Sequence, residues 1–398
     1  MTKNILVLSE VQEGGEWISI LRLIGATKNI SDKYNFFLIA FSQEKTYKDK
    51  LFDDVLLIKS SSANPPFSFI KKYFWDFLHA RENLKRFSMD NDFDLIIITN
   101  FLFALPLFTI SKLKRITFIY LFQGIKSIPI RKFSDLDYRQ LVIKFLERLG
   151  MLLSSVIVVP SKEAGDYVRA MLGFFSPLKK IVIVGVSIPI EFFNKPTVSH
   201  LYTLRKKIGL KSHQNVILYS GRIAKFKGLE NLIEGFSILL HKSPKSVLIL
   251  AYPKKGIDNE LSTNLRIKVK KLGLEEKVKF ITNLSLNKLV GIYYLADVLV
   301  LPSEIEMAPL VIIEALATQT PCMGSKVGNI ESILSQIDNR LLLNNNSPDE
   351  ISKSLNYFFN LSKEEINKIK QRGLQIAKNY TPEASGKSFL ALIRSLRI

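Results

Sequence analysis

A run of four apolar residues, Val298 to Leu301, constrains the fold of this chain most strongly. The run has no polar position, which is typical of a strand buried on both faces of a parallel sheet. The chain then breaks at Pro302 and Ser303 and continues, from Pro309 in a first-turn position, as a helical pattern. This order predicts an α/β unit whose loop lies at the carboxyl end of the strand.

Similar apolar runs alternate with helical patterns along the whole chain. We expect strands in the first half at 5–8, 36–41, 55–58, 94–98, 116–122, 156–159 and 181–184, and in the second half at 216–219, 247–250, 278–281 and 298–301. Strands separated by helices predict doubly wound parallel sheets, whose ligands lie beyond the carboxyl ends of the strands. The segment 187–199 has two prolines and no clear period, and it is predicted to be a linker.

The charge of the chain restricts its partners. Lysine and arginine number 56 and aspartate and glutamate 36, which gives a formal net charge of +20 over 398 residues. Nucleic acid, an anionic membrane and phosphorylated ligands would all be attracted, but the charge is spread along the chain, which weakens the case for nucleic acid.

The one cysteine, Cys322, excludes an internal disulfide. The four histidines lack metal-ligand spacing and are expected at the surface: His79, His200, His213 and His241.

Two segments are relevant to whether the chain spans or contacts a membrane. The apolar stretch 95–110 falls short of the roughly 20 residues that a spanning helix needs, and it is predicted to be a strand, a turn and a short buried helix. With no signal-peptide pattern, a cytoplasmic protein is expected. The segment 66–87 mixes aromatic residues with basic ones such as Lys71 and Lys72. It suits an interfacial helix on an anionic bilayer, or a helix packed on the sheet with a solvated basic edge.

Two carboxylates follow the strand at 298–301. Glu306 lies just before the helix, and Glu314 lies more than a turn along it. A helix N-terminus collects unpaired N–H groups and a positive dipole, so it can hold a phosphate group. A ligand with hydroxyl groups on either side of a diphosphate would satisfy both carboxylates. The alternative is an ordinary corner with two solvated glutamates.

Two cations stand at a comparable corner after the strand at 216–219. Gly221 makes the turn, and Arg222 and Lys227 follow beside the start of a helix. The planar fork of arginine and the point charge of lysine suit a diphosphate, although a solvated basic loop is the alternative. In the first half, Gly14 and Gly15 follow the first strand, where a simple turn is the alternative to a ligand loop. Gln123 follows the strand at 116–122, where an active-site side chain could lie.

Together these ordered signals resemble the GT-B retaining glycosyltransferases of family 4, the glycosyl transferases group 1. That family opens its second domain with a Gly-Arg-hydrophobic turn and a Lys-Gly pair, and it continues with Pro-Ser, two glutamates separated by seven residues, Glu-Ala and a loop with proline and glycine. The matching residues here are Gly221, Arg222, Ile223, Lys227, Gly228, Pro302, Ser303, Glu306, Glu314, Ala315, Pro321, Gly328 and Glu331. The resemblance covers most of the chain.

The resemblance implies an α/β fold of two Rossmann-like domains facing each other across a cleft. The domain at 1–190 would bind the acceptor and the domain at 200–380 the donor, and a C-terminal helix at 381–398 would cross back to the first domain. The activity implied is transfer of a hexose-type sugar, with retention of configuration, from a nucleotide-diphosphate donor of UDP or GDP type to a glycan or lipid-linked acceptor. No metal or other cofactor is implied, and nucleic acid is not an expected partner.

The family's site residues map onto this chain one by one. Arg222 and Lys227 would neutralise the diphosphate as it leaves, Glu306 would bond the donor sugar's hydroxyls, and Glu314 would bond the ribose. The other donor-site residues would be Met307, Ala308, Leu310 and Val311, through backbone N–H groups, with Gly14 and Gly15 of the acceptor-side glycine loop and Gln123.

The chain also departs from the family, and other functions stay open. Pro309 and Gln319 replace usual glycines, and Gln123 replaces a histidine that many members have. The expected role is in glycoconjugate or cell-surface polysaccharide biosynthesis, with peripheral membrane contact through 66–87. The alternatives are a non-catalytic nucleotide-sugar or nucleic-acid binding protein and a GT-B sugar-nucleotide epimerase.

Overall fold

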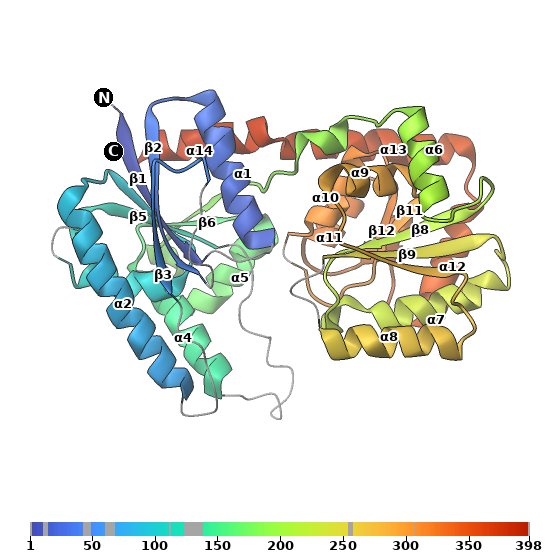
Figure 1. The fold of residues 1–398 in the computed structure, drawn as a ribbon, viewed down its shortest axis with the longest axis horizontal. Coiled ribbons are helices and arrows are strands. Elements are labelled where there is room, and N and C mark those ends of the chain that lie inside the picture. Colours follow the sequence, from blue (N-terminus) through green and yellow to red (C-terminus); the bar gives the residue numbers. More distant parts are fainter. Residues whose placement is uncertain are drawn as a thin grey trace. The chain divides into compact units, whose positions relative to one another are not determined.

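The computed structural model describes residues 2–10, 15–42, 49–59, 68–110, 113–122, 138–253, 258–306 and 308–396. The chain divides into two compact units. Unit 1 comprises Met1–Val186 and Ser385–Ile398, and unit 2 comprises Ser187–Ala384. Each unit holds one parallel sheet with helices on both faces (Figure 1). The predicted α/β class, with two doubly wound sheets, is confirmed.

Within the described residues, the sheet of unit 1 has seven strands in the order β3-β2-β1-β4-β5-β6-β7. Their bounds are β1 Lys3–Glu10, β2 Tyr34–Ser42, β3 Asp54–Lys59, β4 Leu95–Ile98, β5 Thr117–Leu121, β6 Val156–Val159 and β7 Lys180–Ile183. Each lies within two residues of its predicted position. The strand order reverses between β1 and β4, and α/β sheets bind ligands at such a switch point.

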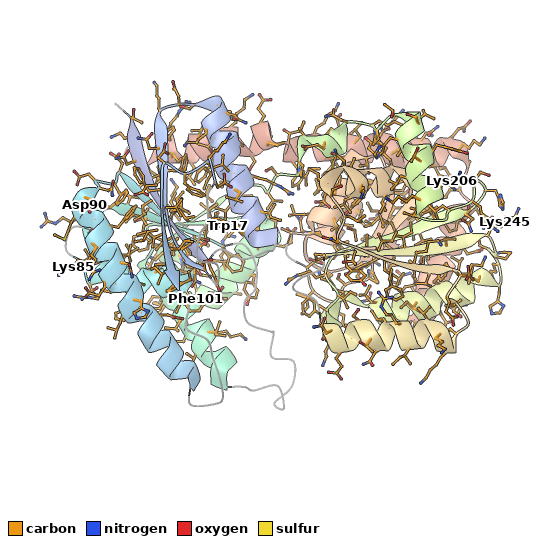
Figure 2. The ribbon with its side chains drawn as sticks, viewed as in Figure 1. Trp17, Lys85, Asp90, Phe101, Lys206 and Lys245 are labelled. Carbon is orange, nitrogen blue, oxygen red and sulfur yellow. The ribbon has the colours of Figure 1, made fainter. Side chains whose placement is uncertain are left out.

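Helices cover both faces of this sheet because its strands are apolar on both sides. One face carries α1 (Gly15–Ile30) and α14 (Pro382–Ser395), and the other carries α2 (Ser68–Asp90), α3 (Ala104–Phe108), α4 (Tyr138–Leu153) and α5 (Lys162–Leu172). Successive strand residues face opposite ways, so Ile5 packs on the α1 side and Leu6 on the α2 side. Trp17 and Phe101 lie inside these layers, whereas Lys85 lies at the periphery (Figure 2).

The C-terminal helix α14 belongs to the core of unit 1, as predicted. Phe389, Leu390 and Ile393 are buried against the α1 face of the sheet. A Cβ at Gly386 would lie 2.8 Å from Ile30 and 3.0 Å from Ala26, so the glycine permits α14 to approach α1 closely.

Unit 2 contains a second sheet, which in the described part of the chain has the order β10-β9-β8-β11-β12-β13. Its strands are β8 Asn215–Ser220, β9 Ser246–Tyr252, β10 Val278–Thr282, β11 Val298–Leu301, β12 Cys322–Ser325 and β13 Leu342–Leu343. The helices are α6 Val198–Lys207, α7 Leu229–Leu240, α8 Asn259–Lys271, α9 Leu286–Leu295, α10 Leu310–Ala317, α11 Gly328–Leu334, α12 Pro348–Phe359 and α13 Lys363–Ala377. The order reverses between β8 and β11, so the switch point lies where these two strands end.

The predicted linker at 187–199 is not a free connection. Ile188 and Phe192 are fully buried in the core of unit 2, and Ile188 N donates to Tyr380 O at 3.0 Å. A 3₁₀ segment, η5 (Ile190–Phe193), follows Pro189, and α6 begins at Val198. The boundary between the units falls at the start of this segment, after Val186, but the segment itself packs in unit 2. The prolines hide any regular period that would have indicated this packing.

The predicted interfacial helix at 66–87 corresponds to α2, whose side chains are described from Asp76 onward. Ala80 and Leu84 are buried, and Phe87 stacks on Phe93 with ring centroids 6.0 Å apart. Lys85 is exposed. This half of the helix therefore packs on the sheet with a basic outer edge. The side chains of Lys71 and Lys72 lie outside the described part. None of the described helices has both the length and the apolar character needed to cross a membrane.

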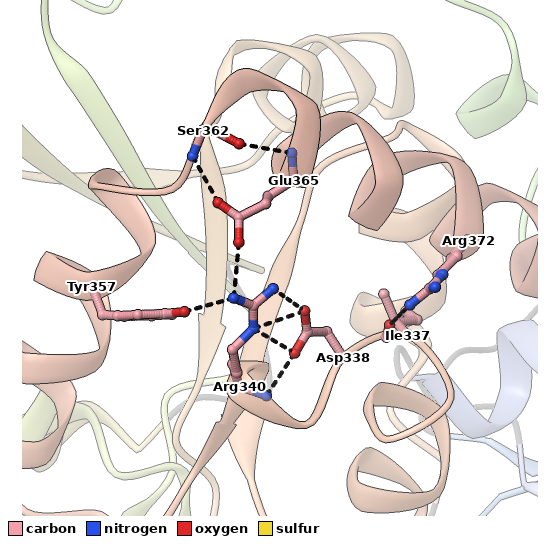
Figure 3. A network of polar contacts seen from close by, with 7 residues as sticks. All are labelled: Ile337, Asp338, Arg340, Tyr357, Ser362, Glu365 and Arg372. Carbon is pink, nitrogen blue, oxygen red and sulfur yellow. Dashed lines mark hydrogen bonds and ion pairs between the residues drawn. The ribbon is translucent and has the colours of Figure 1, made fainter.

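A polar network on the surface of unit 2 joins the 3₁₀ segment η7 (Asn339–Leu341) to α12 and α13 (Figure 3). Arg340 donates through Nη2 to Asp338 Oδ2 at 2.7 Å and through Nη1 to Glu365 Oε1 at 2.9 Å and Tyr357 Oη at 2.7 Å. Ser362 and Glu365 also form a capping box at the start of α13. We call this set of residues the Arg340 network.

Candidate functional site

Two loops meet at the switch point of unit 2. One follows β8 and contains Gly221 and the 3₁₀ segment η6 (Lys225–Lys227), and the other follows β11 and leads into α10. Glu304 N donates to Phe226 O at 2.8 Å, which joins the loops through their backbones. Gly228 has φ +66°, and a Cβ there would overlap Pro302 O. The glycine of the Lys-Gly pair is therefore required for the two loops to touch.

Lys227 and Glu306 form an ion pair across these loops, although 79 positions separate them in the sequence. Their side chains are only 14% and 13% exposed. Ser303 Oγ donates to the same carboxylate oxygen, Glu306 Oε1, at 3.1 Å. Two predicted residues from separate motifs thus lie in contact. Because burying an ion pair carries a desolvation cost, its position at a switch point indicates a function beyond stability.

Tyr219, the second-last residue of β8, helps to hold this arrangement. It is fully buried, and its hydroxyl donates to Arg222 O at 2.7 Å. Burial raises the pKa of Tyr219, the negative charge of Glu306 raises it further, and the positive charge of Arg222 opposes the rise. Arg222 and Glu306 therefore both lie near the Tyr219 hydroxyl. Arg222 itself is exposed.

Glu314 lies on α10, is 8% exposed, and is held by a second buried tyrosine. Tyr293 Oη donates to Glu314 Oε2 at 2.8 Å, and Tyr293 also has a side-chain hydrogen bond with Ser220. Burial and the Glu314 charge raise the pKa of Tyr293, so its hydroxyl keeps its proton and remains a donor. Tyr219 and Ser220 are neighbours on β8 and face opposite sides of the sheet. At the end of β8, Tyr219 thus lies near Glu306, and Ser220 bonds to the tyrosine that holds Glu314.

The start of α10 carries the predicted backbone donors. The helix begins at Leu310, and Pro309, predicted in the first turn, is instead the residue that precedes it, with φ −74° and ψ 88°. Ala308, Leu310 and Val311 are half-buried. The first N–H groups of a helix have no acceptor within it, so Leu310 N and Val311 N are placed to meet an anion. Met307 lies outside the described residues.

In unit 1 the predicted residues are placed only in part. Gly15 begins α1, whereas Gly14 and Gln123 lie outside the described residues. The structure adds two side chains that the sequence analysis missed, Glu10 at the end of β1 and Asn100 just after β4. Asn100 Nδ2 donates to Glu10 Oε2 at 3.3 Å, at the switch point of this sheet. Their signal in the sequence was a pair of polar residues after each apolar run, Ser9 and Glu10 in one case and Thr99 and Asn100 in the other.

The described residues contain no group of three or more histidine, cysteine, aspartate or glutamate side chains that could hold a metal ion. All four histidines are exposed, as predicted. Cys322 is fully buried, and burial raises the pKa of its thiol, which disfavours the thiolate that binds metals.

An open pocket of about 360 Å³ adjoins the same two loops. Its lining comes from the loops and from the first turns of α7 and α8 and includes Lys225, Glu230, Asp258, Glu260 and Glu304. The pocket is acidic although the chain as a whole is basic.

Part of the second half of the chain matches a known family model. Residues 202–375 match the family model described as glycosyl transferases group 1. The chain is 28% identical over 227 residues to D-inositol 3-phosphate glycosyltransferase of Corynebacterium urealyticum, which covers 56% of this chain and 53% of that protein. It is 36% identical over 135 residues to mannosylfructose-phosphate synthase of Agrobacterium fabrum, which covers 33% and 29%. The matches thus span about half or less of these relatives.

Solved structures resemble the chain over nearly its whole length. Sucrose-phosphate synthase from Thermosynechococcus elongatus has a TM-score of 0.79 at 16% identity, covering 99% of both chains. HepE of Anabaena, solved in complex with UDP, has a TM-score of 0.73 at 18% identity, covering 98% of this chain and 100% of that one. At these identities the likeness establishes the fold, which is GT-B as the sequence analysis predicted.

Proposed function

We propose that the chain, whose residues 202–375 match the family model of the glycosyl transferases group 1, transfers a hexose-type sugar from a nucleotide-diphosphate donor to a glycan or lipid-linked acceptor. We further propose that the transfer retains the anomeric configuration and needs no metal ion. Unit 2 would hold the donor and unit 1 the acceptor. The donor base would be uridine or guanosine, and HepE of Anabaena, whose structures contain UDP and UDP-glucose, favours testing uridine first.

The observation that carries the proposal is the contact of Lys227 with Glu306 at the switch point of unit 2. The two side chains place a cation and a carboxylate side by side, and a nucleotide sugar presents a diphosphate next to sugar hydroxyls. When the bond between the anomeric carbon and the diphosphate oxygen breaks, negative charge develops on the diphosphate. Lys227 and Arg222 would stabilise that charge, and Glu306 would accept hydrogen bonds from the sugar.

Glu314 and the start of α10 would complete the donor site. Because Tyr293 already donates to Glu314 Oε2, the carboxylate is held in one orientation for a ribose hydroxyl. The N–H groups of Leu310 and Val311 would meet the phosphates. The acceptor side would include Glu10 and Asn100, which lie at the corresponding edge of the sheet in unit 1.

The first test is a thermal-shift screen of UDP, GDP, ADP and CDP against the full chain. A diphosphate that binds the folded state raises the melting temperature by mass action, by an amount that grows with its concentration. We expect one base to give the largest shift and Lys227→Met to abolish it. If no diphosphate shifts the parent while RNA binds with a steep salt dependence, a nucleic-acid binding protein replaces the transferase.

The second test measures turnover. Consumption of the preferred nucleotide sugar is followed with acceptors that include phosphorylated inositol, phosphorylated sugars and lipid-linked glycans, because the names of the relatives include inositol and sugar phosphates. Glu306→Gln should abolish transfer while the variant keeps the circular dichroism spectrum of the folded parent. An unchanged rate would remove Glu306 from the mechanism. Proton NMR of the product then reports the anomeric configuration, and a chelator tests the need for metal.

A further inference from the structure

Unit 1 displays large apolar side chains on one stretch of its surface. Phe174 is 90% exposed, Leu178 74% and Phe175 42%, and all three lie in the 3₁₀ segment η4 (Gly173–Leu178) between α5 and the edge strand β7. We call these three residues the η4 patch. Three exposed apolar side chains within five consecutive positions point to a binding surface rather than to scattered surface residues.

The patch is held in place from behind. Arg148 on α4 lies with its guanidinium carbon 5.7 Å from the centre of the Phe175 ring, and its Nη2 donates to Leu172 O at 3.0 Å. Lys179 Nζ donates to Ser154 O at 2.9 Å. Gly173, with φ +55°, turns the chain out of α5. These contacts at both ends of η4 fix the segment while Phe174 and Leu178 face water.

The charge of the surrounding stretch of the chain indicates what kind of surface the patch would bind. The stretch from α4 to β7 has seven cations, Arg139, Lys144, Arg148, Lys162, Arg169, Lys179 and Lys180, and three anions, Glu147, Glu163 and Asp166, a net charge of 7 − 3 = +4. Glu147 is buried, and Asp166 is paired with Arg169. Apolar side chains in a stretch of the chain with a net positive charge match an interface that is apolar below and anionic at its surface.

We propose that the η4 patch docks unit 1 on an anionic lipid bilayer. Phe174, Phe175 and Leu178 would enter the headgroup layer, and the exposed Lys180 would meet lipid phosphates. A second copy of the chain fits less well, because a symmetric contact would bring the same cations face to face. The described half of α2 fits less well than the patch, because Ala80, Leu84 and Phe87 face the sheet. The inference rests on no step of the proposed reaction.

The test is flotation of the full chain with vesicles of phosphatidylcholine and phosphatidylglycerol. We expect the parent to float with them but not with pure phosphatidylcholine. The triple variant Phe174→Ser, Phe175→Ser and Leu178→Ser should lose at least about tenfold in bound fraction, since each apolar side chain removed weakens partitioning. A matched control, Val198→Ser with Tyr202→Ser, removes apolar side chains that are 81% and 70% exposed in unit 2. It should float like the parent.

Three results would overturn the proposal. The first is equal flotation of the parent and the triple variant. The second is loss of flotation in Lys71→Glu with Lys72→Glu while the triple variant still floats, which would assign the contact to 66–87. The third is a parent that does not float but elutes as a dimer that the triple variant dissociates. Because the substituted side chains are exposed, the variants should fold. A Phe174→Trp variant adds a direct readout, a blue shift of its fluorescence on anionic vesicles.

Discussion

Two ion-pair clusters of unit 2, Lys227 with Glu306 and the Arg340 network, differ in how their groups are used. In the Arg340 network, residues from three neighbouring elements surround one guanidinium, and Nε, Nη1 and Nη2 all have acceptors. The Lys227 pair instead joins the ends of two strands at a switch point and is more deeply buried. A lysine ammonium has three donors, so pairing with one carboxylate leaves capacity for a second anion.

This difference suggests a rule that separates structural ion-pair clusters from ligand-binding ones in this molecule. A cluster whose donors are all satisfied by neighbours in the chain fastens the fold, as the Arg340 network fastens η7 to α12 and α13 (Figure 3). A cluster at the carboxyl ends of β8 and β11 has groups that can still bind a ligand. The rule is open to four tests.

The largest expected effect is on catalysis. Lys227→Met should lower the rate of sugar transfer by about 10² to 10³, the loss typical when one group that stabilises developing negative charge is removed. Arg340→Met is the matched control and should leave the rate within about twofold, because its contacts are structural. Steady-state donor turnover by both variants measures the contrast. Similar losses in the two variants would contradict the distinction between the clusters.

A second test breaks the contact between the two loops. Gly228→Ala places a methyl group onto Pro302 O at a positive φ, so we expect the free energy of unfolding to fall by about 2 to 3 kcal/mol. Urea denaturation followed by circular dichroism measures it. Gly273→Ala serves as the control, since that glycine has a similar φ of +65° with no atom within 4 Å of its Cβ position. If both variants lose equal stability, backbone strain alone explains why glycine is required at position 228.

A third test concerns the orientation of Glu314. Tyr293→Phe removes the hydroxyl that donates to Glu314 Oε2. A hydrogen bond to a charged group contributes about 1.5 to 3 kcal/mol, so the variant should be less stable and its donor KM should rise about tenfold. We expect kcat to change less than KM, because Tyr293 acts through Glu314 on the ribose rather than on the reacting atoms. A fall in kcat with KM unchanged would place Tyr293 in another role.

The smallest effect is the pH dependence of the Arg340 network. Hydrogen bonds from Arg340 hold the pKa of Asp338 below its ordinary value of 3.8. A lowered folded pKa contributes stability that is present above the unfolded pKa and is lost as pH falls through the folded one. The free energy of unfolding of the parent should therefore exceed that of Arg340→Met by about 1 kcal/mol at pH 7. The difference is small because the side chain of Arg340 is 45% exposed to screening solvent, and it should shrink below about pH 4. Urea midpoints across this range measure it, and a margin independent of pH would exclude the mechanism.

The strands could be predicted because buried parallel strands leave unbroken apolar runs. β6 and β11 fall where the runs predicted them. β13 was missed because it has only two residues, and β12 because Gly324 and Ser325 interrupt its apolar run. The missing side chain of Gly324 makes room for Ile330 and Leu301 O. Such a strand is defined by its neighbours, and no local pattern reveals it.

The site was predictable as a set of residues but not as a set of contacts. Motifs placed Lys227 and Glu306 at strand ends, yet their contact depends on β8 and β11 being neighbours, which only the strand order establishes. Tyr219 and Tyr293 were missed for another reason. Within an apolar pattern a tyrosine counts as a hydrophobic residue, and its hydroxyl gains significance only when its acceptor is known.

The inclusion of α14 in the core of unit 1 has a consequence for protein synthesis. The part of the α1 face that α14 covers stays exposed until Phe389 and Ile393 have left the ribosome, and all of unit 2 is made between the two segments of unit 1. At about 5 to 20 residues per second, this interval lasts on the order of 10 to 40 s. During it, a nascent chain would carry a finished unit 2 and an incomplete unit 1, so chaperones would have most reason to bind the latter.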